Sequence, residues 1–305
     1  MIRHDLTPAR LQLLLLVLLS IVPAVPTHGQ VRTLTHDGEK RRFIVHLPLS
    51  YSSNEDQRYP VVLNFHGGGM TMAEQMMYTR MNDASDRHDF IVVYPQGLGQ
   101  DWNVGFETSY QDGNDDVGFV AALLDRLEAD FRIDGTRVYA AGLSRGGFFT
   151  HRLAAELSHR VAAIAAVGAP LPVPVETLQQ PRGERSAVGV MIVHGTADRV
   201  VDYLGKEGSY LSAADSRAYW ARRHGLGGAA ETTRQLDEDP YDSTSVTILE
   251  AGSGHHAVAL VTIHNGGHTW AGADPFNVGL PIGRTSREVD LNEVIWHFLA
   301  AHRRQ

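Results

Sequence analysis

Short apolar stretches alternate along this chain with longer segments in which apolar residues recur at helical spacing. Residues 59–65 and 90–95 have the β-branched and aromatic content of buried strands, and further strands are expected at 161–167, 188–193 and 257–263. Strands that alternate with helices are typical of parallel sheets, because each crossover lays a helix on the sheet. The pattern therefore predicts an α/β fold, with a mostly parallel central sheet and helices on both faces.

Turn and cap residues predict the elements at the two ends of this pattern. Residues 31–34 and 42–47 flank an Asp-Gly turn, which predicts an antiparallel hairpin ahead of the parallel strands. A helix is expected over about 115–131, where two aspartates precede apolar residues at helical spacing, and a closing helix over 289–302. No stretch resembles a linker between two cores, so one catalytic domain is expected over residues 31–305.

The first thirty residues differ from the rest of the chain. Two arginines precede an apolar run at 11–22, which is too short to span a bilayer comfortably and has the length of a signal-peptide core. We therefore expect residues 1–30 to be a signal peptide, cleaved near residue 29 or 30, although no clean A-x-A site is present. The alternative is an uncleaved anchor. Cleavage would give a secreted or periplasmic protein without a stable membrane span.

Composition and charge exclude some classes of function. The 305 residues are 43% hydrophobic and 20% charged, as in ordinary soluble domains, and the formal net charge is −8. No block of like charges appears, so binding to nucleic acid is not expected. The chain has no cysteine, which excludes disulfides and a cysteine-linked lipid anchor.

The main candidate for chemistry is the sequence Gly142-Leu143-Ser144-Arg145-Gly146. It lies between an apolar strand at 137–141 and a helix that is expected to begin near Gly147. This is the G-x-S-x-G pattern of a nucleophile elbow, in which a tight turn exposes the serine hydroxyl at the end of a strand. The setting predicts that Ser144 is the nucleophile of a serine hydrolase.

A serine hydroxyl needs a base to remove its proton and an acid to orient that base. In α/β-hydrolases the acid and then the histidine follow the serine along the chain. Asp198 comes just after a buried strand and is the expected acid, with Asp202 as the alternative. His268 lies in a Gly-rich loop that can reach back over the sheet and is the expected base, with His264 as the alternative.

A hydrolase of this kind also needs backbone N–H groups that stabilise the oxyanion. One is expected from Arg145, the residue after the nucleophile. A second is expected from the His66-Gly67-Gly68-Gly69 turn, where glycines allow the main chain to approach a ligand. Gly67 and Gly68 are the candidates, and the choice between them stays open. The alternative is a glycine-rich turn that only closes a strand.

Taken together, these motifs resemble those of the poly(3-hydroxybutyrate) depolymerase / feruloyl esterase family of secreted α/β-hydrolases. The resemblance implies a Ser-Asp-His triad at Ser144, Asp198 and His268. It also implies hydrolysis of feruloyl or acetyl esters of plant polysaccharide, or of hydroxyalkanoate esters, in small or polymeric substrates. Many family members carry cysteines, and this chain has none. The stretches that carry the resemblance are 64–69, 115–119, 142–147, 194–201 and 266–270.

Two tryptophans and a cluster of methionines are weaker candidates for substrate contacts. Trp102 and Trp270 could stack on an aromatic or sugar ring, and ordinary packing is the alternative for both. Five methionines between residues 70 and 81 could form an apolar lip, although a helix packed on the sheet is the favoured interpretation.

No metal and no cofactor are expected. Asp112, Asn114 and Asp116 have the alternate spacing of a calcium loop, but the glycine and the final glutamate of that loop are missing. His264 and His268 are four residues apart, yet Gly266-Gly267 between them argues against the helix of a zinc motif.

Two other functions compete with an esterase. Related folds with the same triad cleave peptides, but a prolyl-oligopeptidase-type enzyme usually carries a large accessory domain, for which this chain has no room. The second is a binding protein on an inactive hydrolase fold, which an intact Ser144, Asp198 and His268 argue against.

Overall fold

The structure is a computed structural model that describes residues 29–176, 178, 187–239, 241–274 and 281–304. The expected signal peptide lies outside the described residues, apart from its last two positions. Within the described ranges, no helix has both the length and the apolar character needed to cross a bilayer.

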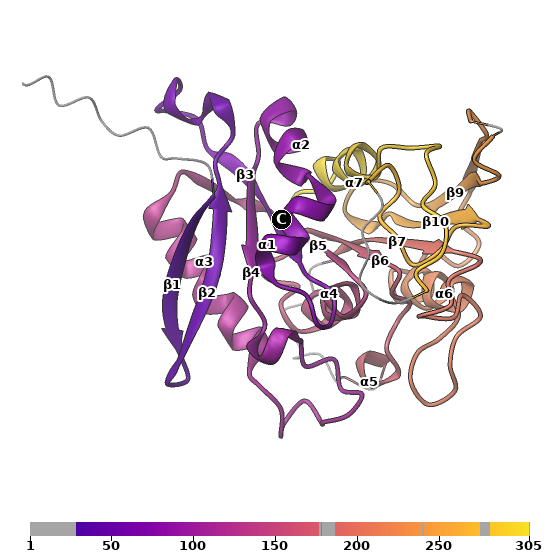
Figure 1. The fold of residues 1–305 in the computed structure, drawn as a ribbon, viewed down its shortest axis with the longest axis horizontal. Coiled ribbons are helices and arrows are strands. Elements are labelled where there is room, and N and C mark those ends of the chain that lie inside the picture. The colour runs from indigo at the N-terminus through magenta and orange to yellow at the C-terminus, as the bar shows by residue number, and fades with distance from the viewer. Residues whose placement is uncertain (1–28, 177, 179–186, 240, 275–280, 305) are drawn as a thin grey trace, which may run out of the picture.

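A single twisted sheet of ten strands runs through the described residues, in the order β1-β2-β4-β3-β5-β6-β7-β10-β9-β8 (Figure 1). Its centre is parallel, from β4 through β10, and each end carries antiparallel strands. The central strands are β3 (Tyr59–Phe65), β4 (Ile91–Pro95), β5 (Ile133–Leu143), β6 (Ala163–Val167), β7 (Gly189–Gly195) and β10 (Val258–His264). The outer strands are β1 (Gln30–His36), β2 (Glu39–His46), β8 (Glu231–Leu236) and β9 (Ser245–Ala251).

Helices cover both faces of the sheet, and each face has its own apolar core. The first face packs against α3 (Asp116–Asp130), α4 (Arg145–Glu156) and α6 (Ala213–Arg223). The second packs against α1 (Met72–Thr79), α2 (Met81–His88) and α7 (Leu291–Ala300). A short α5 (Val173–Glu176) and 3₁₀ turns at Leu49–Ser52, Leu98–Gln100 and Gly254–His256 complete the described elements.

This architecture confirms the predicted α/β fold, and it differs from the prediction mainly in the second half of the chain. The hairpin is present, although its second strand begins three residues earlier than predicted, and β5 begins four residues before the predicted strand at 137–141. The five other predicted parallel strands are present within two residues. The helix after the elbow begins at Arg145 rather than near Gly147, and the closing helix is shorter than expected. The antiparallel pair β8–β9 and the helix α6 were not predicted, because β8 is polar and exposed and α6 is mostly polar.

His151 joins α4, the helix that follows the elbow, to α6. Its Nδ1 accepts a hydrogen bond from Trp220 Nε1 at 3.1 Å, so its Nε2 carries the proton and donates to Ala169 O at 3.1 Å. Burial lowers the pKa of His151 to about 4. The fold therefore holds this histidine neutral between two helices.

We expect His151 to make the protein less stable as the pH falls from about 6.5 to about 4. In that window the unfolded chain binds a proton at this position and the folded protein does not, so acidification favours unfolding by on the order of 2–3 kcal/mol. Urea unfolding at pH 7 and pH 4.5 measures the loss, and His151→Gln, which does not titrate, should lose less. If wild type and His151→Gln lose the same free energy of unfolding between pH 7 and pH 4.5, the prediction is wrong.

Candidate active site

Ser144 forms a strained turn between β5 and α4. Its backbone angles are φ 53° and ψ −121°, which L-residues rarely adopt, and its N–H donates to Val167 O at 2.8 Å. A Cβ atom at Gly146 would lie 2.3 Å from Phe65 O, and one at Gly142 would lie 2.5 Å from the carbonyl carbon of Gly146. The two glycines of the motif are thus required by close backbone approach around the serine.

Asp198 lies in the loop after β7 and is buried, with only hydrogen-bond donors around its carboxylate. Oδ1 accepts from Val200 N at 2.8 Å and Val201 N at 2.9 Å. Oδ2 accepts from His268 Nδ1 at 2.6 Å and lies 3.2 Å from His194 Nε2. Burial alone would raise the pKa of Asp198, but the hydrogen bonds from the two histidines outweigh it and hold the pKa well below its usual range.

His268 is carried back over the sheet by the loop after β10. A Cβ atom at Gly168, the residue after β6, would lie 2.9 Å from the His268 ring. Because Ser144 N bonds to Val167 O at the end of the same strand, the structure places the serine and this ring at neighbouring positions. Gly267 N donates to Arg284 O at 2.8 Å and Trp270 N to Tyr78 Oη at 2.9 Å, which fixes the loop.

The alternative acid and base lie elsewhere. Asp202 is exposed, and its Oδ1 accepts from Leu204 N at 2.8 Å. His264 is also exposed, with its Nε2 2.8 Å from Thr247 Oγ1. The structure therefore brings together Asp198 and His268, and neither alternative.

The His66–Gly69 turn lies directly beside Ser144. A Cβ atom at Gly67 would be 3.6 Å from Ser144 Cβ, and one at Gly68 would be 2.9 Å from Arg145 Cγ. Gly69 N donates to Gln100 O at 2.9 Å, whereas the N–H groups of Gly67 and Gly68 have no acceptor within the described part of the chain. The N–H of Arg145, in the first turn of α4, has no intrahelical acceptor either. These three donors are free to bind an anion.

The buried side chains of His66 and Trp102 stabilise the His66–Gly69 turn from inside the protein. The sequence did not predict this role. His66 Nδ1 donates to Gly67 O at 2.8 Å, while His66 Nε2 accepts from Gly97 N at 3.0 Å. Burial lowers the pKa of His66, which favours this neutral form. Trp102 Nε1 donates to His66 O at 3.0 Å, and its ring stacks on Phe149. His194, beneath Asp198, was likewise not predicted.

The expected substrate contacts of the two tryptophans do not agree with the structure. Trp102 is 2% exposed and Trp270 is 1% exposed, and Trp270 Nε1 donates to Asn292 Oδ1 at 3.2 Å. Each indole therefore packs inside the protein and supports the site from within. The methionines agree with the favoured packing interpretation, because Met72 and Met81 are buried, although Met77 on α1 is 73% exposed.

Aromatic residues that the sequence did not single out form a cluster next to the side chain of Arg145. The Phe148 ring is 5.0 Å from that of Phe106 and 5.3 Å from that of Tyr210. Arg145 Nη2 donates to Glu107 Oε1 at 2.7 Å, and its guanidinium lies 5.3 Å from the centre of the Phe106 ring. This ion pair holds the pKa of Glu107 below its usual range. The side chain after the nucleophile is thus fixed against an aromatic cluster.

The described residues contain no group of three or more His, Cys, Asp or Glu side chains placed to hold a metal. The carboxylate of Asp116, from the calcium-like spacing, instead accepts from Arg41 Nη2 at 2.7 Å and Asn103 N at 2.8 Å. Burial raises the pKa of this carboxyl group.

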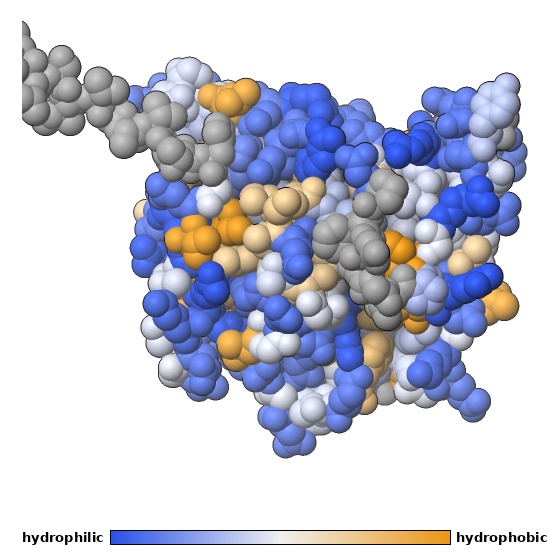
Figure 2. All heavy atoms as spheres, in the orientation of Figure 1, coloured by the Kyte–Doolittle hydropathy of each residue, from blue (hydrophilic) through white to orange (hydrophobic). Residues whose placement is uncertain are grey.

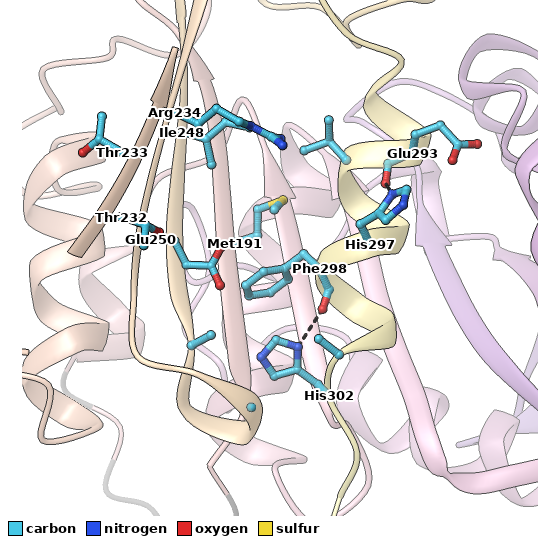
Figure 3. Close-up of a pocket in the computed structure, with 14 residues that line it drawn as sticks. Met191, Thr232, Thr233, Arg234, Ile248, Glu250, Glu293, His297, Phe298 and His302 are labelled. Atoms are coloured by element: carbon cyan, nitrogen blue, oxygen red, sulfur yellow. Dashed lines mark hydrogen bonds between the residues drawn. The ribbon is translucent and has the colours of Figure 1, made fainter. Parts of the chain in front are cut away.

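A cavity of about 600 Å³ lies away from these residues, between α7 and the β8–β9 pair (Figure 3). Met191, Ile248 and Phe298 give it an apolar floor, while His297 and Glu293 lie along α7 at its rim. Met191 is near the start of β7, whereas Asp198 follows the end of that strand. No candidate catalytic side chain lines this cavity, and we assign no chemistry to it.

Replacing Gly68 with alanine should lower kcat about 10- to 100-fold, because its new methyl group would displace the turn from Arg145 and misplace one donor. Hydrolysis of a short acyl ester, followed beside thermal unfolding, measures the effect. Gly227→Ala is the matched control, because a Cβ atom there meets nothing within 4 Å. A kcat within twofold of wild type for Gly68→Ala would contradict the proposed position of the donors.

Comparisons with known proteins agree with this architecture. The family described as esterase PHB depolymerase matches residues 44–202, just over half of the chain. Putative esterase NocK of Nocardia uniformis subsp. tsuyamanensis is 28% identical over 299 residues, covering 91% of this chain and 84% of that protein. The bifunctional acetylxylan esterase/xylanase XynS20E of Neocallimastix patriciarum is 30% identical over 213 residues, covering 67% of this chain and 30% of that protein. The structure of acetyl xylan esterase from Aspergillus awamori has a TM-score of 0.62, at 16% identity, over 90% of this chain and all of that one.

The sheet order and the two helical layers are those of an α/β-hydrolase. With the family match over residues 44–202, the chain belongs to the esterase PHB depolymerase family. It is a carboxylic ester hydrolase.

Proposed function

We propose that this protein hydrolyses esters through a triad of Ser144, Asp198 and His268. The observation that carries the proposal is the 2.6 Å contact between His268 Nδ1 and Asp198 Oδ2, beside a strained serine at the end of β5. Because Asp198 accepts from Nδ1, the neutral ring has its free lone pair on Nε2, where a base is required. A buried carboxylate surrounded by donors stays ionised and stabilises the imidazolium that forms.

In this mechanism His268 removes the proton from the Ser144 hydroxyl as its oxygen attacks the ester carbonyl. The N–H of Arg145 and one or both of the Gly67 and Gly68 N–H groups stabilise the oxyanion. The alcohol leaves with the proton from His268. Water, activated by the same histidine, then releases the acid from Ser144.

We propose feruloyl or acetyl esters of plant polysaccharide, or hydroxyalkanoate esters, as the substrates. The acetylxylan esterase activity named for the relative XynS20E supports the first class, and the family description supports the second. The half-buried Phe106 ring, which lies near the side chain of Arg145, suits an apolar or aromatic acyl group. The basic and then apolar start of the chain supports a secreted or periplasmic location.

Parallel hydrolysis of methyl ferulate, acetylated xylan and a hydroxybutyrate trimer tests the proposal. His268→Ala should abolish the activity, whereas His264→Ala and Asp202→Asn, the alternatives along the chain, should keep it. Labelling of Ser144 by a fluorophosphonate shows whether the serine is activated, independently of the substrate. Loss of activity in His264→Ala but not in His268→Ala would overturn the triad. Labelling without hydrolysis of any of the three esters would favour a peptidase.

A further inference from the structure

A second hollow, of about 520 Å³, opens where the loops of the expected acid and base meet. It lies at the carboxyl ends of β7 and β10, the same edge of the sheet as the triad. The residues that line it are Ala197, Arg199, Ser243, Asn265, Pro281, Gly283 and Arg284. Two of them are cations, and no described residue that lines the hollow is acidic.

The two arginines are free to bind an anion. Both are exposed, and neither forms an ion pair with another described residue. By contrast, the surface residues Arg87 and Arg160 each pair with two carboxylates. The formal net charge of the chain is −8, so two neighbouring arginines without a direct ion pair form a local exception to its overall negative charge.

Asp242 is the acidic residue that Arg284 contacts, and the two charges attract each other although they form no direct ion pair. Arg284 Nη1 donates to the carbonyl oxygen of Asp242 at 2.6 Å. The Asp242 carboxylate instead accepts from Thr244 N at 2.6 Å and from Arg287 N at 2.7 Å. Four of the five N–H donors of the Arg284 guanidinium therefore remain for a ligand.

The hollow is built on the backbone that carries the triad. Arg199 follows Asp198 directly, and Ala197 N donates to Gly266 O at 2.9 Å. Arg284 O accepts from Gly267 N, the residue before His268, at 2.8 Å. A ligand bound here would thus sit at a fixed distance from the reacting centre, on the β10 side of the acid and the base.

We propose that Arg199 and Arg284 form a subsite for a carboxylate that the ester substrate carries away from its scissile bond. Two exposed guanidinium groups that form no ion pair with another described residue match a carboxylate, which accepts paired N–H donors. Such a carboxylate can come from a uronate sugar of an esterified polysaccharide, or from the free acid end of a hydroxyacid oligomer. This inference rests on the proposed function, because it assigns the part of the substrate that lies beyond the ester.

Two matched pairs of substrates test the subsite. The first is an acetylated glucuronoxylan oligosaccharide and the same oligosaccharide with its uronate reduced to a neutral sugar. The second is a hydroxybutyrate trimer with a free carboxylate and its methyl ester. The wild-type KM should be about 3- to 10-fold lower for the acidic member of at least one pair, since exposed ion pairs contribute modestly. The pair that shows the difference identifies the source of the carboxylate.

The double variant Arg199→Ala/Arg284→Ala should remove this difference and leave the KM of the neutral members unchanged. Arg287→Ala is the matched control, because Arg287 is an exposed arginine three residues from Arg284 that does not line the hollow. About 0.5 M salt should weaken the preference in wild type by screening. A preference that survives in the double variant, or a KM that rises equally for both members of a pair, would overturn the subsite.

A binding measurement separates this proposal from the proposed function. De-esterified glucuronoxylan oligosaccharide and hydroxybutyrate trimer acid are titrated calorimetrically into the Ser144→Ala protein, with and without the two arginine substitutions. Binding that weakens severalfold when the arginines are replaced supports the subsite even if wild type hydrolyses none of the esters. Binding that is equal in both proteins, or absent, overturns it even if the esterase activity is confirmed.

Discussion

Replacing Ser144 with alanine should lower kcat for ester hydrolysis by about 10⁴- to 10⁶-fold, as expected when the nucleophile of a triad is removed. The remaining rate would come from the oxyanion donors and from substrate binding. Because Ser144 Oγ forms no hydrogen bond to another described residue, its loss should leave the fold intact. Single-turnover hydrolysis with purified protein, supported by an unchanged circular dichroism spectrum, measures the effect. A rate within tenfold of wild type would mean that another group attacks the ester.

A second substitution at the same position separates chemistry from backbone strain. The φ of 53° and ψ of −121° cost a non-glycine residue about 1–3 kcal/mol, and glycine avoids most of that cost. Glycine also loses about 0.5–1 kcal/mol more than alanine through the entropy of the unfolded chain. Ser144→Gly should therefore be inactive, yet about 1 kcal/mol more stable than Ser144→Ala in urea unfolding. A Ser144→Gly protein that is less stable than Ser144→Ala would show that the backbone at this position is not strained.

Asp198→Asn should lower kcat about 10³- to 10⁴-fold and destabilise the fold as well. The partners of the carboxylate, Val200 N, Val201 N, His194 Nε2 and His268 Nδ1, are all donors. An asparagine must turn its NH₂ group toward one pair of these donors, which costs about 1–3 kcal/mol. Where that pair includes His268, the ring loses the partner that fixes its tautomer. Kinetics and urea unfolding measure the two effects, and Asp202→Asn is the matched control.

The stability difference between wild type and Asp198→Asn should depend on pH. The pKa of Asp198 is lowered in the folded protein, so its carboxylate stabilises the fold above about pH 4, the ordinary pKa of an unfolded aspartate. That contribution is lost as the pH falls further, because the unfolded chain then binds a proton at this aspartate while the folded protein does not. The free energies of unfolding of wild type and Asp198→Asn should therefore converge below pH 4. If the two free energies of unfolding differ by the same amount from pH 7 to pH 3, the prediction is wrong.

Local sequence predicted the parallel core of the sheet and the triad candidates, because the signals for both are local. Residues 59–65 form β3 with the predicted bounds, since every side chain in that strand is buried and apolar residues dominate it. β9 was missed although its residues alternate between more and less buried positions, a period-2 signal that was present in the sequence. β8 gave no such signal, because its side chains are nearly all exposed.

The parts of the site that the sequence could not reveal depend on contacts between distant segments. His194 lies under Asp198 only because β7 ends in a tight turn, and Arg284 reaches the hollow only through its backbone contact with Gly267. Trp102 and Trp270 were predicted to contact the substrate because they lie near the motifs in the sequence. Both are buried and support the motifs from inside the protein. The distribution of apolar residues on the surface also did not indicate where the site lies. On the face shown in Figure 2, apolar residues form small patches among polar ones.

The attachment of the His268 loop to Ile282 and Arg284 has a consequence for biosynthesis. The Ser144 turn is formed by residues 142–146, but the proposed base, His268, is held by contacts with residues that follow it along the chain. A nascent polypeptide therefore cannot assemble the proposed triad until the segment that contains Ile282 and Arg284 has left the ribosome. Until then the proposed triad lacks its fixed base, so we expect the nascent chain to be inactive toward esters inside the cell that makes it.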